Sequence, residues 1–242
     1  GGDDVADRDD VRRWLLPLLI EEAGEEFARR YQLMRVVRRP RRPIVVLIGG
    51  TAGVGKSELA AELAYRLGIV RVVSSDSLRQ ALRSLISPEL SPVLHASSYD
   101  AWLAELLPIE RATAKPKKKR VVRGFQAQVL QLATAIAAVA QRGVTERTSL
   151  VLEGVHLVPG VSPGPIEGAM VVELMLTVED ADIHRARFGR REGRTGARRP
   201  EAPYARHFDE IRILQRWLTR RAEAEGIPVL DVTDLDEAVQ RA

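Results

Sequence analysis

The stretch that decides the fold is Ile44-Val-Val-Leu-Ile-Gly-Gly-Thr-Ala-Gly-Val-Gly-Lys-Ser57. Its first part, Ile44–Ile48, is a short apolar run rich in β-branched residues, which is typical of a strand buried on both faces of a parallel sheet. The second part, Gly50–Ser57, matches the pattern G-x-x-x-x-G-K-[ST] in full, and a helical pattern follows it over Glu58–Leu67. A strand, a glycine-rich loop and a helix in this order predict a phosphate-binding P-loop.

Each part of this loop suits the phosphates of a nucleotide. Glycines let the backbone curl so that its N–H groups converge on a phosphate, and the positive end of the following helix dipole points to the same place. Lys56 is expected to reach the β- and γ-phosphates, and the hydroxyl of Ser57 to ligate Mg²⁺. The residues predicted to bind ATP are Gly50, Thr51, Ala52, Gly53, Val54, Gly55, Lys56, Ser57 and Glu58.

Apolar strands alternate with helical segments along the rest of the chain. Further strands are predicted at Ile69–Val73, Ser149–Leu152, Met170–Thr177 and Pro228–Val232. Helices are predicted at Ser75–Ile86, Asp100–Leu107, Val121–Gln141 (ended by Gly143), Tyr204–Glu225 and Asp234–Arg241, with a loop at Ser87–Ser98. The alternation predicts an α/β fold of three layers, in which helices cover both faces of a five-stranded parallel sheet.

A boundary is predicted before the first strand. Asp9–Val37 has apolar residues at helical spacing and no strand alternation, and the two prolines of Arg38–Pro43 then interrupt any helix. We therefore predict an N-terminal helical appendage over residues 1–42 and a P-loop domain over residues 43–242.

The amino-acid composition excludes several classes of protein and site. Apolar residues make up 45% and charged residues 29%, as in globular proteins with a sizeable core, and no apolar run reaches the length of a membrane span. The absence of cysteine excludes disulfides and thiolate metal sites. The acidic start, Gly1–Asp10, lacks the apolar stretch of a signal peptide, so we expect a cytoplasmic location and no membrane partner.

Two acids are placed where phosphoryl transfer needs them. Glu153 follows the third strand, where it is expected to hold Mg²⁺ or orient the acceptor, although an ordinary strand-end acid is the alternative. Asp76 follows the second strand, and we predict that it positions the acceptor hydroxyl and takes its proton. Because Asp is also common at helix starts, a purely structural role for Asp76 stays open.

Arginines provide candidate anion sites. Arg79 and Arg83 share a helix face and suit the carboxylate or phosphate of a substrate, or else form a solvated surface. His184–Arg199 is dense in arginine, which predicts a mobile lid that closes on anions, with Arg187 and Arg191 in catalysis and Arg194 at the nucleotide. An exposed basic stretch or a nucleic-acid patch is the alternative, and the run Lys115–Arg120 is expected to be a solvated loop.

The net charge of +4 is modest and aromatic residues are only 5% of the chain, so stacking platforms for single strands are scarce. We therefore expect a small anionic, phosphorylated substrate as the partner rather than nucleic acid. The oligomeric state is not predicted.

Several segments together resemble the 2-phosphoglycerate kinase family. They are Gly49–Ser57, Ser75-Asp-Ser-Leu-Arg79, Leu94-His-Ala-Ser-Ser-Tyr99, Glu153-Gly-Val-His-Leu-Val-Pro-Gly160, His184…Arg187-Phe188 and Tyr204…Phe208…Ile211-Arg212…Gln215. The resemblance covers about residues 43–230, and the block Glu153–Gly160 is its most specific part. It implies ATP-dependent phosphorylation of 2-phosphoglycerate to 2,3-bisphosphoglycerate, and a core like that of nucleoside monophosphate kinases, with strand order 2-3-1-4-5.

The resemblance also implies which residues line the acceptor site. They are Asp76, Arg79, His95, Tyr99, Glu153 and His156, to which Arg83 and Arg123 are added as candidate grips for the acceptor's carboxylate and phosphate. Two other functions stay open: a P-loop kinase for a different small phosphorylated acid or polyol, and a nucleotide-regulated nucleic-acid-binding protein.

Overall fold

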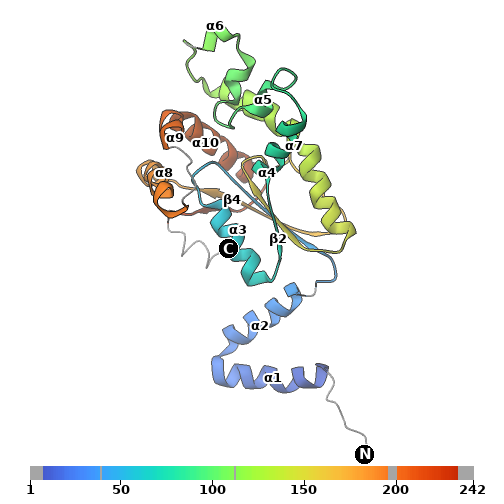
Figure 1. The fold of residues 1–242 in the computed structure, drawn as a ribbon. Coiled ribbons are helices and arrows are strands. Elements are labelled where there is room, and N and C mark those ends of the chain that lie inside the picture. Colours follow the sequence, from blue (N-terminus) through green and yellow to red (C-terminus); the bar gives the residue numbers. More distant parts are fainter. Residues whose placement is uncertain (1–7, 39, 112, 196–200, 234–242) are drawn as a thin grey trace, which may run out of the picture. The chain divides into compact units, whose positions relative to one another are not determined.

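The strand that leads into the P-loop, β1 (Ile44–Gly50), is buried along its whole length. Figure 1 shows the computed structural model, which describes residues 8–38, 40–111, 113–195 and 201–233. Over these residues the chain forms a five-stranded sheet in the order β2-β3-β1-β4-β5. The other strands are β2 (Arg71–Ser74), β3 (Leu150–Gly154), β4 (Met170–Thr177) and β5 (Val229–Asp231). Neighbouring strands pair in parallel, so the predicted α/β fold and the order 2-3-1-4-5 are confirmed.

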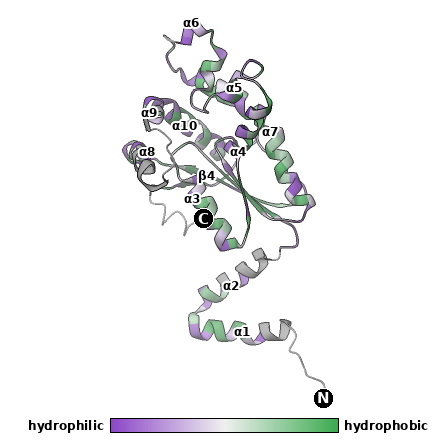
Figure 2. Cartoon of the chain, viewed as in Figure 1, coloured by the Kyte–Doolittle hydropathy of each residue, from purple (hydrophilic) through white to green (hydrophobic). Residues whose placement is uncertain are grey.

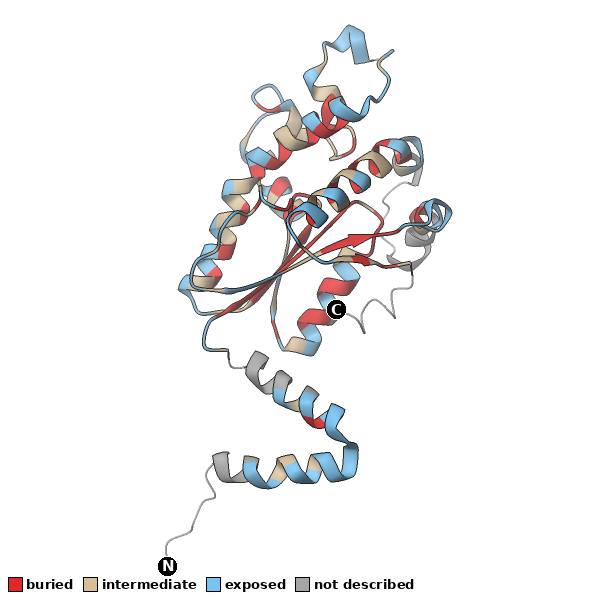
Figure 3. Ribbon diagram, turned by 180° about the vertical axis from the view of Figure 1, so that it is seen from behind, coloured by how far each residue is buried: buried red, intermediate tan, exposed pale blue. Residues whose placement is uncertain are grey.

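Helices cover both faces of this sheet. Val45 and Leu47 of β1 pack in one apolar cluster with Leu132 and Ile136 of α7 (Lys118–Thr145). Because side chains alternate along a strand, the intervening residues face the opposite side, where α3 (Lys56–Leu67) contacts β1, β2 and β3. Figures 2 and 3 show the result: apolar residues follow the strands and the inner side of α7, and most of the sheet is buried.

The remaining helices connect the strands. They are α4 (Ser75–Leu85), α5 (Pro92–His95), the 3-10 helix η1 (Ala101–Glu105), α6 (Pro108–Arg111), α8 (Ala181–Thr195), α9 (Glu201–Arg206) and α10 (Phe208–Ala224). Of these, α10 contacts β4 and β5 and also packs on α7. The part of the chain from Arg42 onward forms one compact unit around the sheet.

The structure corrects several predictions of local structure. The run Lys115–Arg120, expected to be a solvated loop, is a loop only up to Lys117, because Lys118 begins α7. The helix expected to stop at Gly143 continues to Thr145, because Gly143 is buried and its missing side chain makes room for Leu150. The segment expected to be a loop at Ser87–Ser98 contains α5, which Pro92 opens at a position where its missing N–H costs nothing.

A further correction concerns the helix expected over Tyr204–Glu225. It is two helices, because His207 leaves the helical conformation between α9 and α10. The imidazole of His207 stacks on Tyr99, a residue far away in the sequence, and its Nδ1 lies 3.1 Å from Oε1 of Glu210, three residues further on. The helix predicted at Asp234–Arg241 lies outside the described residues.

The part of the chain up to Arg41 forms a second compact unit. Its helices are α1 (Arg8–Ala23) and α2 (Glu25–Arg38), which contact each other and are joined at Gly24. No helix within the described ranges combines the length and the apolar character needed to cross a membrane.

Candidate active site

The P-loop connects β1 to α3 at the carboxyl end of the sheet. Gly55 precedes α3 with φ of 86°, a left-handed conformation that glycine adopts without a steric cost. The ammonium of Lys56 donates to the carbonyl of Thr51 at 2.6 Å, across the loop. The hydroxyl of Thr51 is buried and has no hydrogen-bond partner within the described part of the chain. The loop therefore carries a cation bonded to the backbone of Thr51 and, on the same residue, a hydroxyl without a partner among the described residues.

Ser57 and Glu153 meet beside this loop. Glu153 lies at the end of β3, in register with Ile48 of β1 and Ser74 of β2, and its side chain is buried. The hydroxyl of Ser57 donates to Oε1 of Glu153 at 3.0 Å. The structure thus brings together the two residues that the sequence analysis assigned to magnesium, although they are 96 positions apart in the chain.

Asp76 lies in the first turn of α4, which begins directly after β2. The hydroxyl of Ser74 accepts a hydrogen bond from the backbone N–H of Asp76 at 3.2 Å and so caps the helix. One carboxylate oxygen of Asp76 accepts from Arg79, with Nε at 2.9 Å and Nη2 at 2.8 Å. Asp76 is therefore held at the same edge of the sheet as Glu153, because Ser74 and Glu153 are neighbours across β2 and β3.

Arg79 is almost entirely buried and holds more than this acid. Its Nη1 donates to the carbonyls of Leu94, at 3.2 Å, and Ala96, at 3.0 Å, which lie at the end of α5. Arg83, one turn further along α4, is partly exposed and donates to Gln80 at 3.2 Å. The two arginines therefore differ: Arg79 fixes Asp76 and the chain around α5, whereas Arg83 lies closer to solvent.

His156 is enclosed by protein on every side. Its Nε2 lies 3.0 Å from Oε1 of Gln128, and its Nδ1 lies 2.9 Å from the hydroxyl of Ser75. The amide nitrogen of Gln128 already donates to the carbonyls of Val93 and Ala96, so its oxygen accepts the Nε2–H of His156. The Nδ1 then accepts from Ser75. Burial lowers the pKa of His156 to about 3, so the imidazole is neutral.

This arrangement depends on Gly154, the last residue of β3, which lies against the start of α4. Its φ is +152°, and a Cβ added there would lie 1.8 Å from the hydroxyl of Ser75. Glycine is therefore required both for the backbone conformation and for the close approach of β3 to α4. Contact between His156 and an acceptor would require one of its two protein hydrogen bonds to break, which favours a role in positioning Ser75 and the adjacent Asp76.

Three other predicted acceptor residues occupy different surroundings. Nε2 of His95 donates to the carbonyl of Ile86 at 2.7 Å. Tyr99 is buried, stacks on His207 with ring centroids 5.1 Å apart, and has its pKa raised mainly by burial. Arg123 is exposed and pairs with Glu105 at 2.8 Å. The structure places Tyr99 inside an aromatic group with His207, while Arg123 lies on the surface of α7.

The base of the predicted lid lies against the P-loop. His184 of α8 is buried, and its Nε2 lies 2.8 Å from the carbonyl of Ala52. Arg187 donates from Nη2 to the carbonyls of Val232 and, at 3.1 Å, of Thr233. The side chains of Arg191 and Arg194 and the rest of the lid, residues 196–199, lie outside the described residues.

Sequence reasoning missed four residues around the site. Ser75 and Gln128 form the buried hydrogen bonds to His156, while His184 and His207 contact the P-loop and Tyr99 respectively. Ser75 and His184 lie in segments that carry the family resemblance, but no role was assigned to them, and Gln128 and His207 lie in no motif. The available signal was the position of Ser75 directly before Asp76 and of His184 at the head of the arginine-rich stretch.

Asp100 also escaped prediction. It follows Tyr99, and one of its carboxylate oxygens is buried without a hydrogen-bond partner among the described residues. Burial raises the pKa of its carboxyl group, against the opposing effect of the backbone N–H groups and of His207 and Arg79 nearby. An acid in such a position is a further candidate for contact with the acceptor.

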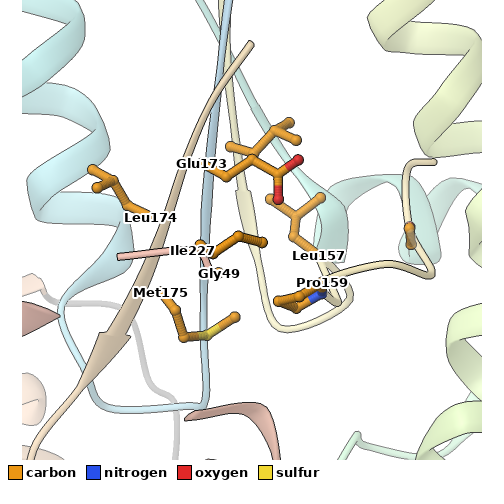
Figure 4. A pocket seen from close by; sticks show the side chains of 9 residues that line it. Gly49, Leu157, Pro159, Glu173, Leu174, Met175 and Ile227 are labelled. Carbon is orange, nitrogen blue, oxygen red and sulfur yellow. The ribbon is translucent and has the colours of Figure 1, made fainter. Parts of the chain in front are cut away.

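A separate cavity lies between β1, β4 and the chain after β3 (Figure 4). It is lined mainly by apolar residues such as Leu157 and Met175, and Glu173 is its acid, with a pKa raised mainly by burial. Its volume of about 10 Å³ is room for a single water molecule. It is therefore not the site of a nucleotide.

Curated relatives match almost the whole chain. The chain is 36% identical over 240 residues to a protein of Pyrococcus horikoshii named "2-phosphoglycerate kinase". This alignment covers 99% of the chain and 76% of the relative. A protein of the same name from Methanocaldococcus jannaschii is 36% identical, over 98% of the chain and 74% of the relative. One from Pyrococcus furiosus is 34% identical, over 98% of the chain and 75% of the relative. No protein-family model matches the chain.

Two solved structures of small-molecule kinases align with most of the chain, at low similarity. A gluconokinase from Sinorhizobium meliloti aligns over 83% of this chain and 89% of its own, with 16% identity and a TM-score of 0.42. A shikimate kinase from Acinetobacter baumannii aligns over 86% of this chain and 94% of its own, with 13% identity and a TM-score of 0.43. Likeness at this level gives no information on substrate.

The P-loop on a parallel sheet of order 2-3-1-4-5 and the near-complete match to curated kinases agree with each other. The protein is an enzyme that transfers phosphoryl groups. Relatives more than 30% identical over about three-quarters of their own length settle its membership: the chain belongs to the 2-phosphoglycerate kinase family.

Proposed function

We propose that the protein transfers the γ-phosphoryl group of ATP to 2-phosphoglycerate, which gives 2,3-bisphosphoglycerate and ADP. The observation that carries this proposal is the meeting of three groups at one edge of the sheet: the P-loop, the Ser57–Glu153 pair and Asp76 held by Arg79. They supply a nucleotide site, a metal site and an acceptor acid side by side. The names of the relatives supply the acceptor.

ATP binds along Gly50–Glu58 in this proposal. The backbone N–H groups of the loop and the amino end of α3 receive the phosphates, since both carry positive partial charge. Lys56 exchanges the carbonyl of Thr51 for a phosphate oxygen. The buried hydroxyl of Thr51, which lacks a partner among the described residues, gains one when a phosphate arrives.

The donors near the loop fit Mg²⁺. The hydroxyl of Ser57 and the carboxylate of Glu153 are hard oxygen ligands only 3.0 Å apart, and magnesium is usually held by one or two protein oxygens together with water and substrate phosphates. Ser57 and Glu153 would therefore hold the ion. When bound, it would neutralise charge on the phosphates.

Asp76 carries the acid–base part of the reaction. Its carboxylate orients the free hydroxyl of 2-phosphoglycerate and takes the hydroxyl proton as the oxygen attacks the γ-phosphorus. A bond between that oxygen and phosphorus forms, the bond from phosphorus to the β,γ-bridging oxygen breaks, and ADP leaves with the released electron pair. Arg79 fixes the carboxylate through two N–H groups, and His156 fixes the helix start through Ser75.

The acceptor carries a carboxylate and a phosphate, so it needs cations. Arg83 is proposed to meet these groups from α4, and His95, Tyr99 and Arg123 stay proposed at the rim of the acceptor site. The lid arginines Arg187, Arg191 and Arg194 are proposed to close on the phosphates. For Arg187 this means that the guanidinium leaves the carbonyls of Val232 and Thr233.

The test is ADP release in the presence of Mg²⁺ and ATP with a panel of acceptors: 2-phosphoglycerate, 3-phosphoglycerate, glycerate, gluconate and a polyol phosphate. Lys56→Ala is the control and should lose at least about a hundredfold in rate, because it removes a charge that acts on the transferring group. Strong stimulation by 2-phosphoglycerate alone, with 2,3-bisphosphoglycerate as the product, supports the proposal. Turnover with another acid or polyol phosphate, and none with 2-phosphoglycerate, would move the assignment to that acceptor.

A further inference from the structure

The contact between α8 and the P-loop has no assigned role in the reaction. It is formed by His184, whose side chain is completely buried. Its Nε2 lies 2.8 Å from the carbonyl oxygen of Ala52, in the middle of the loop that receives the phosphates. The two residues are 132 positions apart in the sequence.

The proton of His184 is on Nε2. Its other ring nitrogen, Nδ1, lies 3.4 Å from Nη1 of Arg212, and arginine can only donate hydrogen bonds, so Nδ1 is the acceptor. Arg212 is itself anchored to the carbonyls of Val178, at 2.6 Å, and Glu179, at 2.8 Å. Burial is the main cause that lowers the pKa of His184 to about 4. The ring is therefore neutral and has a single N–H that can donate a hydrogen bond. That N–H is directed to Ala52.

Aromatic packing holds the imidazole ring in place. Its centroid lies 5.4 Å from that of Phe188 and 5.5 Å from that of Phe208. Phe188 also lies directly against Gly53, since a Cβ added to Gly53 would be 2.6 Å from the tip of the Phe188 ring and 3.0 Å from Nε2 of His184. The side chains of α8 thus fill the space on one side of the Ala52–Gly53 peptide.

The orientation of this peptide matters for phosphate binding. In a trans peptide the carbonyl of one residue and the N–H of the next point in opposite directions. Holding the Ala52 carbonyl against His184 therefore directs the N–H of Gly53 away from α8. Gly53 has φ of +83°, and glycine tolerates both signs of φ, so this peptide can flip unless something holds it. A flipped peptide would present a carbonyl oxygen to the phosphates in place of an N–H.

We propose that His184 is a positioning residue of the nucleotide site: its Nε2–H holds the Ala52 carbonyl outward and so keeps the Gly53 N–H directed at the phosphates of ATP. The base of the arginine-rich helix is thereby part of the nucleotide site before any lid closes. This inference rests on nucleotide binding by the P-loop and not on which acceptor is used.

The test compares His184→Leu, which removes the donor, with His184→Gln, whose amide N–H has nearly the reach of Nε2. Calorimetric titration with Mg·ADP should show a Kd raised about tenfold in the leucine variant, since one aimed N–H is lost, and within about threefold of wild type in the glutamine variant. Both are compared at a temperature well below their melting points. Unchanged affinity in His184→Leu, or equal losses in the two variants, would overturn the inference. Wild-type protein that binds no Mg·ADP would overturn the nucleotide site itself.

A second measurement does not depend on how the leucine variant folds. Nitrogen-15 spectra of histidine-labelled wild-type protein, with His184 assigned from the spectrum of His184→Gln, should show a neutral ring protonated on Nε2 at pH 7. This state should persist on addition of Mg·ADP. A ring protonated on Nδ1, or a charged ring, would overturn the inference because neither matches the hydrogen bonds from Arg212 and to Ala52.

Discussion

Asp76 is the residue on which the proposed chemistry depends most directly. Asp76→Asn keeps the shape of the side chain and a hydrogen bond to Arg79 but removes the proton acceptor. We expect kcat to fall by a factor of about 10² to 10⁴, as for the loss of a general base, while the Kd for Mg·ADP stays within about twofold. Steady-state kinetics and ADP titration measure the two effects separately.

Asp209→Asn is the matched control, because Asp209 is also an acid in the first turn of a helix. It should leave kcat unchanged. If Asp76→Asn retained more than about a tenth of the activity, Asp76 would be a helix-start acid without a chemical role, which is the alternative that the sequence left open.

The neutral imidazole of His156 makes stability depend on pH. Below pH 6.5 the unfolded chain takes up a proton on this residue, whereas the folded protein does not until the pH approaches 3. The unfolded state then binds more protons, so the free energy of unfolding falls as pH drops, by about 1.4 kcal/mol between pH 7.5 and 5.5 from this residue alone. Urea unfolding at the two pH values checks this.

His156→Gln should be less stable than wild type at both pH values and should lose that part of the pH dependence. Val70→Thr, at a position that is 93% exposed, should leave the pH dependence unchanged. Equal pH dependence in wild type and His156→Gln would contradict a neutral, buried His156.

Residues with a local pattern were predictable and residues held by distant partners were not. Lys56 and Ser57 follow from the spacing of the P-loop, and Glu153 from its place at a strand end. The roles of His184 and Gln128 could not be predicted, because their hydrogen-bond partners, the Ala52 carbonyl and His156, are far away in the chain. Which arginines lie near solvent also depends on packing: Arg79 and Arg83 look alike in sequence, yet Arg79 is buried.

At the scale of elements, β3 and α4 approach each other closely at Gly154 and Ser75. Gly154→Ala places a methyl group against Ser75 in a backbone conformation that alanine disfavours, so we expect a loss of about 2–4 kcal/mol in unfolding free energy. It should also lower kcat, since α4 carries Asp76. Thermal and urea unfolding measure the first effect.

Gly164→Ala separates the two causes, because Gly164 has φ of +79° but nothing within 4 Å of an added Cβ. This control should lose only about 1 kcal/mol from backbone strain. Equal losses in the two variants would show that the close approach of Ser75 to Gly154 adds nothing to the cost.

The sheet order and most helices were predictable from periodicity and from the family resemblance, but element ends were less so. Gly143 was expected to end a helix because glycine often does so, and it instead lies inside α7 because Leu150 fills the space of its missing side chain. The break at His207 lies where this residue stacks on Tyr99, a residue that is distant in sequence. Packing overrode local preference in both cases.

At the scale of the whole molecule, the division into two units leads to a test of the predicted domains. The sheet, the P-loop and Asp76 all lie within the unit that begins at Arg42. A chain of residues 43–242 should therefore fold and bind Mg·ADP with a Kd within about twofold of the full chain. Circular dichroism and calorimetry check both expectations. An unfolded fragment, or one that binds Mg·ADP more than about tenfold more weakly, would make residues 1–42 part of the kinase domain.

The buried guanidinium of Arg79 has a consequence for how this protein can evolve. It ties the acid of α4 to two carbonyls at the end of α5, using donors on all three of its nitrogens. Lysine has a single nitrogen at the end of its side chain and cannot reach all of these partners. The exchange of arginine for lysine, which exposed positions tolerate, is therefore not tolerated at position 79. We therefore expect Arg83 and Arg123 to tolerate exchange for lysine, and Arg79 not to.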